Sequence, residues 1–252
     1  MDTAALLAMT AHRPWPLPAR PWALQMAWHE LLFLHWPVAA ALLQPLLPPS
    51  LTVEEFDGTA WLGVVPFRMA ATRLRWLPPL PGARAFPELN VRTYVRGGGR
   101  SGVWFFSLDA DSRLAVCGAR AWFRLPYFLA RMHCERLGDE LHYRSERTHR
   151  GAPTATFAAR WRVNAPFAGP AQGSLATFLT ERYCLFTTDR AGQLCCGDVH
   201  HRPWQLAPAE VELQRCTMTE QLALALPQVP PLALAARTQE VLAWSPRRWP
   251  PA

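Results

Sequence analysis

The feature that most constrains this chain is a pair of strand-like runs joined by three consecutive glycines. Both runs lie within residues 86–127, and Gly97, Gly98 and Gly99 form a connection of the kind that a β-hairpin requires. Apolar and polar residues alternate along the first run, which is the period of a β-strand. The centre of the chain is therefore predicted to be a β-hairpin.

The alternation in the first run places a polar face opposite an apolar one. The polar face has these members: Glu88, Asn90, Arg92, Tyr94 and Arg96. The apolar face has these members: Leu89, Val91, Thr93 and Val95. A carboxylate, an amide and a guanidinium on one strand face either meet solvent or line a polar cavity inside a barrel. The sequence leaves both explanations open.

Short strands are predicted along most of the chain, because its 25 prolines and 14 glycines interrupt it too often for long helices. The further strands are expected at residues 30–36, 59–67, 128–136, 140–148, 156–163, 183–188, 193–200, 211–218 and 234–244. Short helices are expected to open at Pro37, to follow Ser112 as a capping residue, and to span residues 175–180. This pattern predicts a mainly β (α+β) protein with a closed or nearly closed sheet.

The domain prediction divides the chain once. Residues 1–22 are rich in alanine and proline and are expected to be a mobile tail, while residues 23–252 form a single domain with no visible linker. Residues 31–53 carry no charge, but prolines interrupt this stretch, so we expect a soluble protein with no membrane span.

The net charge of +7 does not indicate a nucleic-acid partner. Every one of the 26 basic residues is an arginine, and these arginines are spread singly with no basic stripe. The abundance of arginine, alanine and proline is typical of a compositional bias in the coding sequence. A small molecule is therefore the expected partner, and assembly into a homo-oligomer stays open.

Six cysteines lack the density and spacing of a disulfide scaffold. Cys195, Cys196, His200 and His201 match no closed zinc pattern, so we expect neither a metal nor another cofactor. The N-terminus has no basic region of the kind that opens a secretory signal. These observations predict a cytoplasmic protein with reduced thiols.

Several segments resemble a known family. The three longest are LLFLHWPV at residues 31–38, FDGTAWLGVVPFRM at residues 56–69 and FPELNVRTYV at residues 86–95. SLDADSRLAVCGAR and FLTERYCLF extend the likeness to roughly residues 26–245. They are similar to the YqjF-like bacterial proteins, a family of unknown function within the acetoacetate decarboxylase-like superfamily. The resemblance implies a cone-shaped β-barrel with an enclosed cavity.

A more distant likeness concerns acetoacetate decarboxylase itself. Phe-Pro-Glu at residues 86–88 is similar to an aromatic-x-Glu pattern that faces the cavity of that enzyme. A second pattern, Gly118-Ala119-Arg120 followed by Pro126-Tyr127, is similar in spacing to a Gly-Arg-Glu segment and a Pro-Lys pair of that enzyme. By this likeness, Tyr127 stands where the enzyme carries its Schiff-base lysine. A Schiff base needs a primary amine with a lowered pKa, and this chain contains no lysine. We therefore exclude a Schiff-base acetoacetate decarboxylase and leave open whether the protein is an enzyme.

The candidate site residues come from the polar strand face and from this resemblance. Glu88 and Tyr127 are the catalytic candidates, although no catalytic role is assigned. The ligand-binding candidates are Glu88, Asn90, Arg92, Arg120, Tyr127 and His35. For His35, a buried histidine whose hydrogen bond is satisfied is the favoured interpretation over ligand contact.

Three functions remain open at this stage. The first is the binding of a small organic acid or carbonyl compound in a barrel cavity, without Schiff-base chemistry. The second is a lysine-independent enzyme, of lyase or hydrolase type, that acts on such compounds. The third is a scaffold protein whose barrel is filled by its own aromatic side chains.

Overall fold

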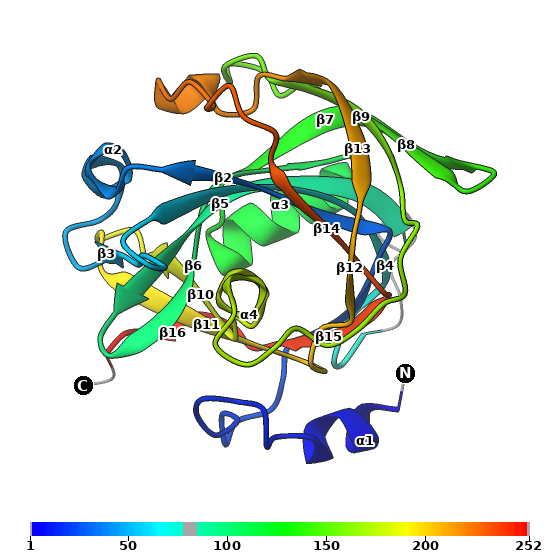
Figure 1. The fold of residues 1–252 in the computed structure, drawn as a ribbon. Coiled ribbons are helices and arrows are strands. Elements are labelled where there is room, and N and C mark those ends of the chain that lie inside the picture. The colour runs from blue at the N-terminus through cyan, green and yellow to red at the C-terminus, as the bar shows by residue number, and fades with distance from the viewer. Residues whose placement is uncertain (1, 78–84, 251–252) are drawn as a thin grey trace.

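The computed structural model describes residues 2–77 and 85–250, and strands dominate it (Figure 1). The strands are β1 Leu24–His29, β2 Leu31–Val38, β3 Thr52–Val53, β4 Ala60–Leu74, β5 Ala85–Gly97, β6 Arg100–Ala110, β7 Tyr127–Leu137, β8 Glu140–Arg147, β9 Thr156–Arg162, β10 Cys184–Thr188, β11 Leu194–His201, β12 Leu206–Pro208, β13 Glu210–Cys216, β14 Leu232–Ala236, β15 Gln239–Ala243 and β16 Arg247–Arg248. The helices are α1 Thr3–Ala8, α2 Ala40–Leu43, α3 Arg113–Gly118 and α4 Leu175–Thr180, with 3₁₀ turns at Gln44–Leu46 and Glu220–Leu222 and a π-helical turn at Ala119–Phe123.

The sheet closes into a ring through β5, which pairs with β4 along one edge and with β6 along the other. From β4 the ring continues through β1, β15, β11 and β10 and returns to β6. Two extensions leave this ring: β14 and β12 follow β2 from β4, and β8, β9 and β13 follow β7 from β6. The protein therefore has the expected mainly β, barrel-like class, although the extensions keep it from being a simple barrel.

The central hairpin is confirmed. The strands β5 and β6 pair in antiparallel register and are joined at Gly98 and Gly99. Both glycines have positive φ, at 53° and 80°. A two-residue connection with this backbone matches the right-handed twist of its strands, and side chains other than glycine adopt it only rarely.

Two hydrophobic cores lie on opposite faces of β5. One fills the space between the outward face of the β2–β4–β5 region and the β7–β8–β9 extension, and Leu89 and Val91 belong to it. The other fills the inside of the ring, with Phe33, Phe67 and Trp204 among its members. The strand β5 is therefore shared by both cores, and its alternation decides which side chains enter each.

Two of the short helices, α3 and α4, begin at serines that cap them. The Ser112 hydroxyl accepts a hydrogen bond from the Ala115 N–H at the start of α3, as the sequence predicted. Ser174 does the same for the Thr177 N–H at the start of α4. Across the described residues, no helix is long and apolar enough to cross a membrane.

Three local expectations differ from the structure. Pro37 still belongs to β2, so the following helix opens only at Ala40, because a strand edge tolerates proline as well as a helix start does. Residues 234–244 form parts of two strands, β14 and β15, which pair with different neighbours. Cys184 and Cys196 form a disulfide across β10 and β11 instead of remaining reduced, because strand pairing brings their Cα atoms to 6.3 Å.

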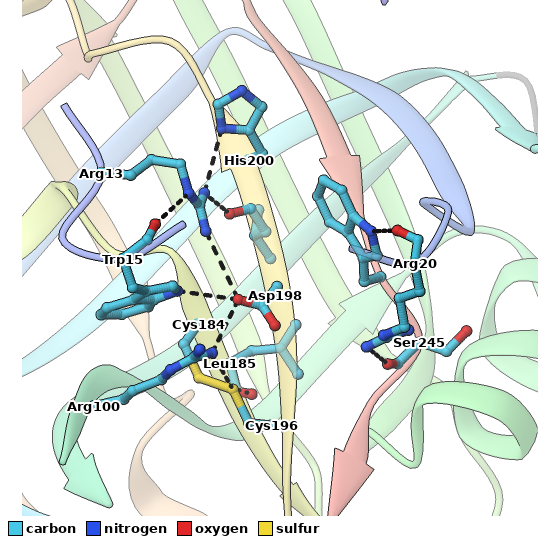
Figure 2. A network of polar contacts seen from close by, with 12 residues as sticks. Arg13, Trp15, Arg20, Arg100, Cys184, Leu185, Cys196, Asp198, His200 and Ser245 are labelled. Atoms are coloured by element: carbon cyan, nitrogen blue, oxygen red, sulfur yellow. Dashed lines mark hydrogen bonds and ion pairs between the residues drawn. A yellow bond between two sulfur atoms is a disulfide. The ribbon is translucent and has the colours of Figure 1, made fainter. Parts of the chain in front are cut away.

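The N-terminal segment, expected to be a mobile tail, is packed against the ring. The Leu6 side chain is fully buried, and Arg13 donates a hydrogen bond of 2.7 Å to the Val199 carbonyl. Figure 2 shows the Trp15 indole donating a hydrogen bond to the Asp198 carboxylate, which also accepts one from Arg100, the first residue of β6. The alanine and proline content, on which the expectation rested, does not reveal that these anchoring side chains find buried partners.

Candidate functional site

The inside of the ring contains a cavity of about 130 Å³. Its wall is mostly apolar and comes from strands that are distant in sequence, with Trp28, Phe33 and Trp204 as large contributors. The polar side chains of the wall are Glu88, Asn90, Arg92 and Tyr127. Four of the predicted ligand-binding residues therefore meet at the wall of one cavity.

Glu88 and Tyr127 form the first polar contact of this wall. Glu88 lies on β5, Tyr127 is the first residue of β7, and both side chains are buried. The Tyr127 hydroxyl donates a hydrogen bond of 3.0 Å to Glu88 Oε2. On the opposite side of the strand, the Tyr143 hydroxyl lies 2.7 Å from the Glu88 carbonyl and donates to it. The carboxyl group and its backbone are both held in place.

The environment of Glu88 favours its neutral form. Burial raises the pKa of the Glu88 carboxyl from 4.5 to about 8, and the hydrogen bond from Tyr127 opposes part of this rise. Burial also raises the pKa of the Tyr127 phenol well above 10, and the neighbouring carboxyl adds to the effect. At neutral pH, both the Glu88 carboxyl and the Tyr127 phenol can therefore be protonated. Glu88 can release or accept a proton near physiological pH.

Asn90 lies two residues further along the same face of β5. Its side chain is 5 % exposed, and its Oδ1 atom has no hydrogen-bond partner in the described part of the chain. A buried acceptor without a partner lowers stability by about 1–3 kcal/mol. Asn90 is therefore ready to accept a hydrogen bond from a molecule in the cavity.

Arg92 supplies the positive charge of the site. Its Nε donates to the Tyr94 hydroxyl at 3.3 Å and its Nη2 to the Leu179 carbonyl at 3.3 Å, while its guanidinium lies 5.1 Å from the centre of the Phe33 ring. No carboxylate within residues 2–77 and 85–250 forms an ion pair with it. A half-buried guanidinium at an apolar cavity is well suited to bind an anionic ligand.

His35 lies beside Arg92 but does not line the cavity. Gly63 of β4 is paired with both residues, and a Cβ there would meet His35 at 3.2 Å and Arg92 at 3.3 Å. The His35 Nε2 atom shares a 2.5 Å hydrogen bond with the Tyr94 hydroxyl. Burial, followed by the charge of Arg92, lowers the pKa of His35 well below its usual value. His35 is therefore neutral, and it contacts the same Tyr94 hydroxyl that accepts a hydrogen bond from Arg92.

Arg120 also lies outside the cavity. Its Nη1 atom donates a 2.7 Å hydrogen bond to the backbone carbonyl of Tyr127, and its side chain borders a separate surface cleft. Arg120 became a candidate only because the spacing of its segment is similar to that of acetoacetate decarboxylase. Its contact supports the position of Tyr127 and does not bring a charge to the cavity.

The apolar part of the wall was missed by the sequence analysis. Leu24, Met26 and Trp28 alternate along β1 and all face the cavity. Their period of two was a usable signal, but this strand was not predicted. Ala119 and Phe123 come from the π-helical turn, which no sequence pattern announced.

The described residues contain no group of three or more histidine, cysteine, aspartate or glutamate side chains that is placed to hold a metal. Cys195 and Cys196 are adjacent residues of β11, and Cys196 is engaged with Cys184. The polar groups that the cavity wall presents are a carboxyl, a phenol, an amide and a guanidinium.

Comparison with known sequences gives a consistent result. Residues 25–240 match the model of DUF2071, a family described as uncharacterized conserved protein. The chain is 45% identical over 234 residues to the uncharacterized protein YqjF of Bacillus subtilis (strain 168). This match covers 92% of the chain and 95% of that relative.

Comparison with solved structures concerns the fold. Acetoacetate decarboxylase from Legionella pneumophila matches with a TM-score of 0.61 and 16% identity, over 97% of this chain and 95% of that one. The enduracididine biosynthesis enzyme MppR, complexed with pyruvate, matches with a TM-score of 0.61 and 13% identity, over 93% of both chains. The ring and its extensions are thus an acetoacetate decarboxylase-like fold.

Proposed function

The chain belongs to the DUF2071 family, and we propose that it binds a small organic acid or carbonyl compound in the cavity of its barrel. The observation that carries this proposal is the Arg92 guanidinium at the edge of a mostly apolar cavity, with no carboxylate paired to it among the described residues. The ligand's carboxylate binds to Arg92. A carbonyl group of the ligand accepts a hydrogen bond from the neutral Glu88, and a hydroxyl group of the ligand donates one to Asn90 Oδ1.

The fold neighbours support this choice of ligand class without deciding it. One of them is described as complexed with pyruvate, a small keto acid. Its identity to this chain is 13%, so its ligand serves here as a choice of probe. A barrel filled completely by its own side chains is disfavoured, because the ring encloses a cavity of about 130 Å³.

Isothermal titration with pyruvate, acetoacetate and butanoate tests the proposal. We expect binding that is weakened at least tenfold by Arg92→Met, because the charge that holds the carboxylate is gone. Arg131→Met is the matched control, since Arg131 lies on β7 with a side chain 78% exposed. If none of the acids binds, or if both variants behave alike, the cavity is not an acid-binding site.

A lysine-independent enzyme is the second candidate. Glu88 favours it, because a buried carboxyl with a pKa raised to about 8 can transfer a proton near neutral pH. Schiff-base chemistry is excluded, since the chain has no lysine. Turnover of a keto-acid panel by the wild-type protein, lost in Glu88→Gln while binding persists, distinguishes catalysis from binding. Binding without turnover of any member rules this candidate out for that panel.

A further inference from the structure

A second apolar space, a groove of about 160 Å³, adjoins the cavity. It runs between β1, β4 and the segment formed by α3 and the π-helical turn. Six residues border both spaces, and they are Leu24, Met69, Glu88, Ala119, Phe123 and Tyr127. The Glu88–Tyr127 pair therefore lies at the junction of the cavity and the groove.

The cavity and the groove together form one path, and one face of β5 runs along its whole length. Phe86 borders the groove, Glu88 borders both spaces, and Arg92 borders the cavity alone. These alternate residues span six positions, which is a path of about 20 Å at the rise of a β-strand. The outer end reaches Leu114 and Trp122, whose side chains are 58% and 43% exposed. The path therefore has Arg92 at its inner end and mainly apolar side chains at its outer end.

Of the two arginines that border this path, Arg92 is the one available to an anion. Arg73 borders the groove, but its Nε and Nη2 atoms both donate to Gln25 Oε1, at 3.1 and 2.7 Å. The two bonds of Arg92 are longer, at 3.3 Å each, and go to a hydroxyl and a backbone carbonyl. A carboxylate is therefore expected at the inner end of the path and the rest of the ligand towards the groove.

We propose that the ligand is an acid with an extended apolar chain, whose carboxylate binds Arg92 and whose chain passes the Glu88–Tyr127 pair into the groove. This inference rests on the proposed function and names the substrate class of the same site. The neutral form of Glu88 suits the passage of an alkyl chain, since no charge must be desolvated beside it. The exposed Leu114 and Trp122 are then the apolar mouth through which the chain enters.

A series of straight-chain carboxylates from butanoate to hexadecanoate tests this inference by isothermal titration with the full chain, because only the longer members extend past Glu88 into the groove. Each added methylene buried in the groove should strengthen binding about threefold to fourfold, until the groove is full. Arg92→Met should weaken the binding of every member of the series, and by more than Arg73→Met does, because the carboxylate is placed at Arg92. The opposite ranking of the two variants would overturn the proposed orientation.

Filling the groove provides the sharper test. Ala115 borders the groove but not the cavity, so Ala115→Phe should remove the dependence on chain length and leave the affinity for butanoate unchanged. Ala121→Phe is the matched control on the exposed side of the π-helical turn. Gly118→Leu is a second blocking variant, because Gly118 borders the groove and a Cβ there meets no atom within 4 Å, so the larger side chain is added without a clash.

The outcomes separate the two proposals. Affinity that depends on Arg92 but not on chain length overturns the extended-chain inference and leaves the proposed function standing. Chain-length dependence that survives both blocking variants overturns the groove as the route. Failure of every acid to bind the wild-type protein overturns the proposed function and this inference together.

Discussion

The two faces of β5 are one residue apart along the chain and lead to different parts of the molecule. Leu89 and Val91 face the core between the sheets, where both are fully buried among apolar side chains. Glu88, Asn90 and Arg92 face the cavity. Among the described residues, Asn90 Oδ1 has no hydrogen-bond partner and Arg92 forms no ion pair with a carboxylate. The apolar face stabilises the fold. The polar face lowers the stability of the fold, and we attribute its presence to the binding of a ligand.

The largest expected effect comes from Glu88→Gln at high pH. The wild-type carboxyl has its pKa raised from 4.5 to about 8, so its contribution to stability is complete below pH 4.5 and is lost as the pH rises to 8. The glutamine amide of the variant stays neutral at every pH and still accepts the bond from Tyr127. We expect the variant to be more stable than wild type at pH 9, by at most about 5 kcal/mol, and equal to it at pH 4.5.

Chemical unfolding at several pH values measures this difference. Glu146→Gln is the control, because the Glu146 side chain is 61% exposed on β8. A gain shared by both variants, or a gain for Glu88→Gln that does not grow with pH, would mean that Glu88 is solvated and that the inner face is not enclosed.

The next effect belongs to the outward face. Leu89→Ala removes a fully buried side chain from the core between the sheets and should lower the free energy of unfolding by about 3 kcal/mol. Binding of butanoate should be unchanged in the protein that remains folded. A loss below about 1 kcal/mol would show that this core is loosely packed and that the two faces of β5 differ less than proposed.

The smallest effect is expected at the neighbouring Asn90. Asn90→Leu removes an oxygen that has no partner among the described residues and extends an apolar side chain towards the cavity. The free energy of unfolding should therefore rise, by about 1 kcal/mol, because the unpaired buried acceptor is gone. Ligands that carry a hydroxyl group should bind less tightly to the variant, whereas butanoate should not. A large destabilisation would instead make Asn90 a structural residue.

The sequence predicted the part of the site that lies on one strand. Alternation along β5 was enough to place Glu88, Asn90 and Arg92 on a common face, because the period of a strand is a local property. The alternation could not show that Arg92 lines the cavity while Arg96, on the same face, lies at the surface. The Arg96 side chain is 58% exposed and forms an ion pair with Glu54, and only long-range pairing decides this.

The remaining parts depended on contacts between distant segments. The disulfide between Cys184 and Cys196, the burial of Leu6 and the apolar walls from β1 all require the sheet to be closed first. Tyr127 was reached through a family resemblance, and the structure places its hydroxyl on Glu88. The π-helical turn has no simple sequence signal, although it separates the cavity from the groove.

The titration of the Glu88 carboxyl tests the central claim most directly. Its ¹³C resonance can be assigned with Glu88→Gln and followed against pH, with and without saturating butanoate. The pKa should be about 8 in the free protein and higher in the complex, because the bound acid excludes water and adds a negative charge. A pKa near 4.5 that butanoate does not change would contradict an enclosed acid-binding cavity on the inner face of β5.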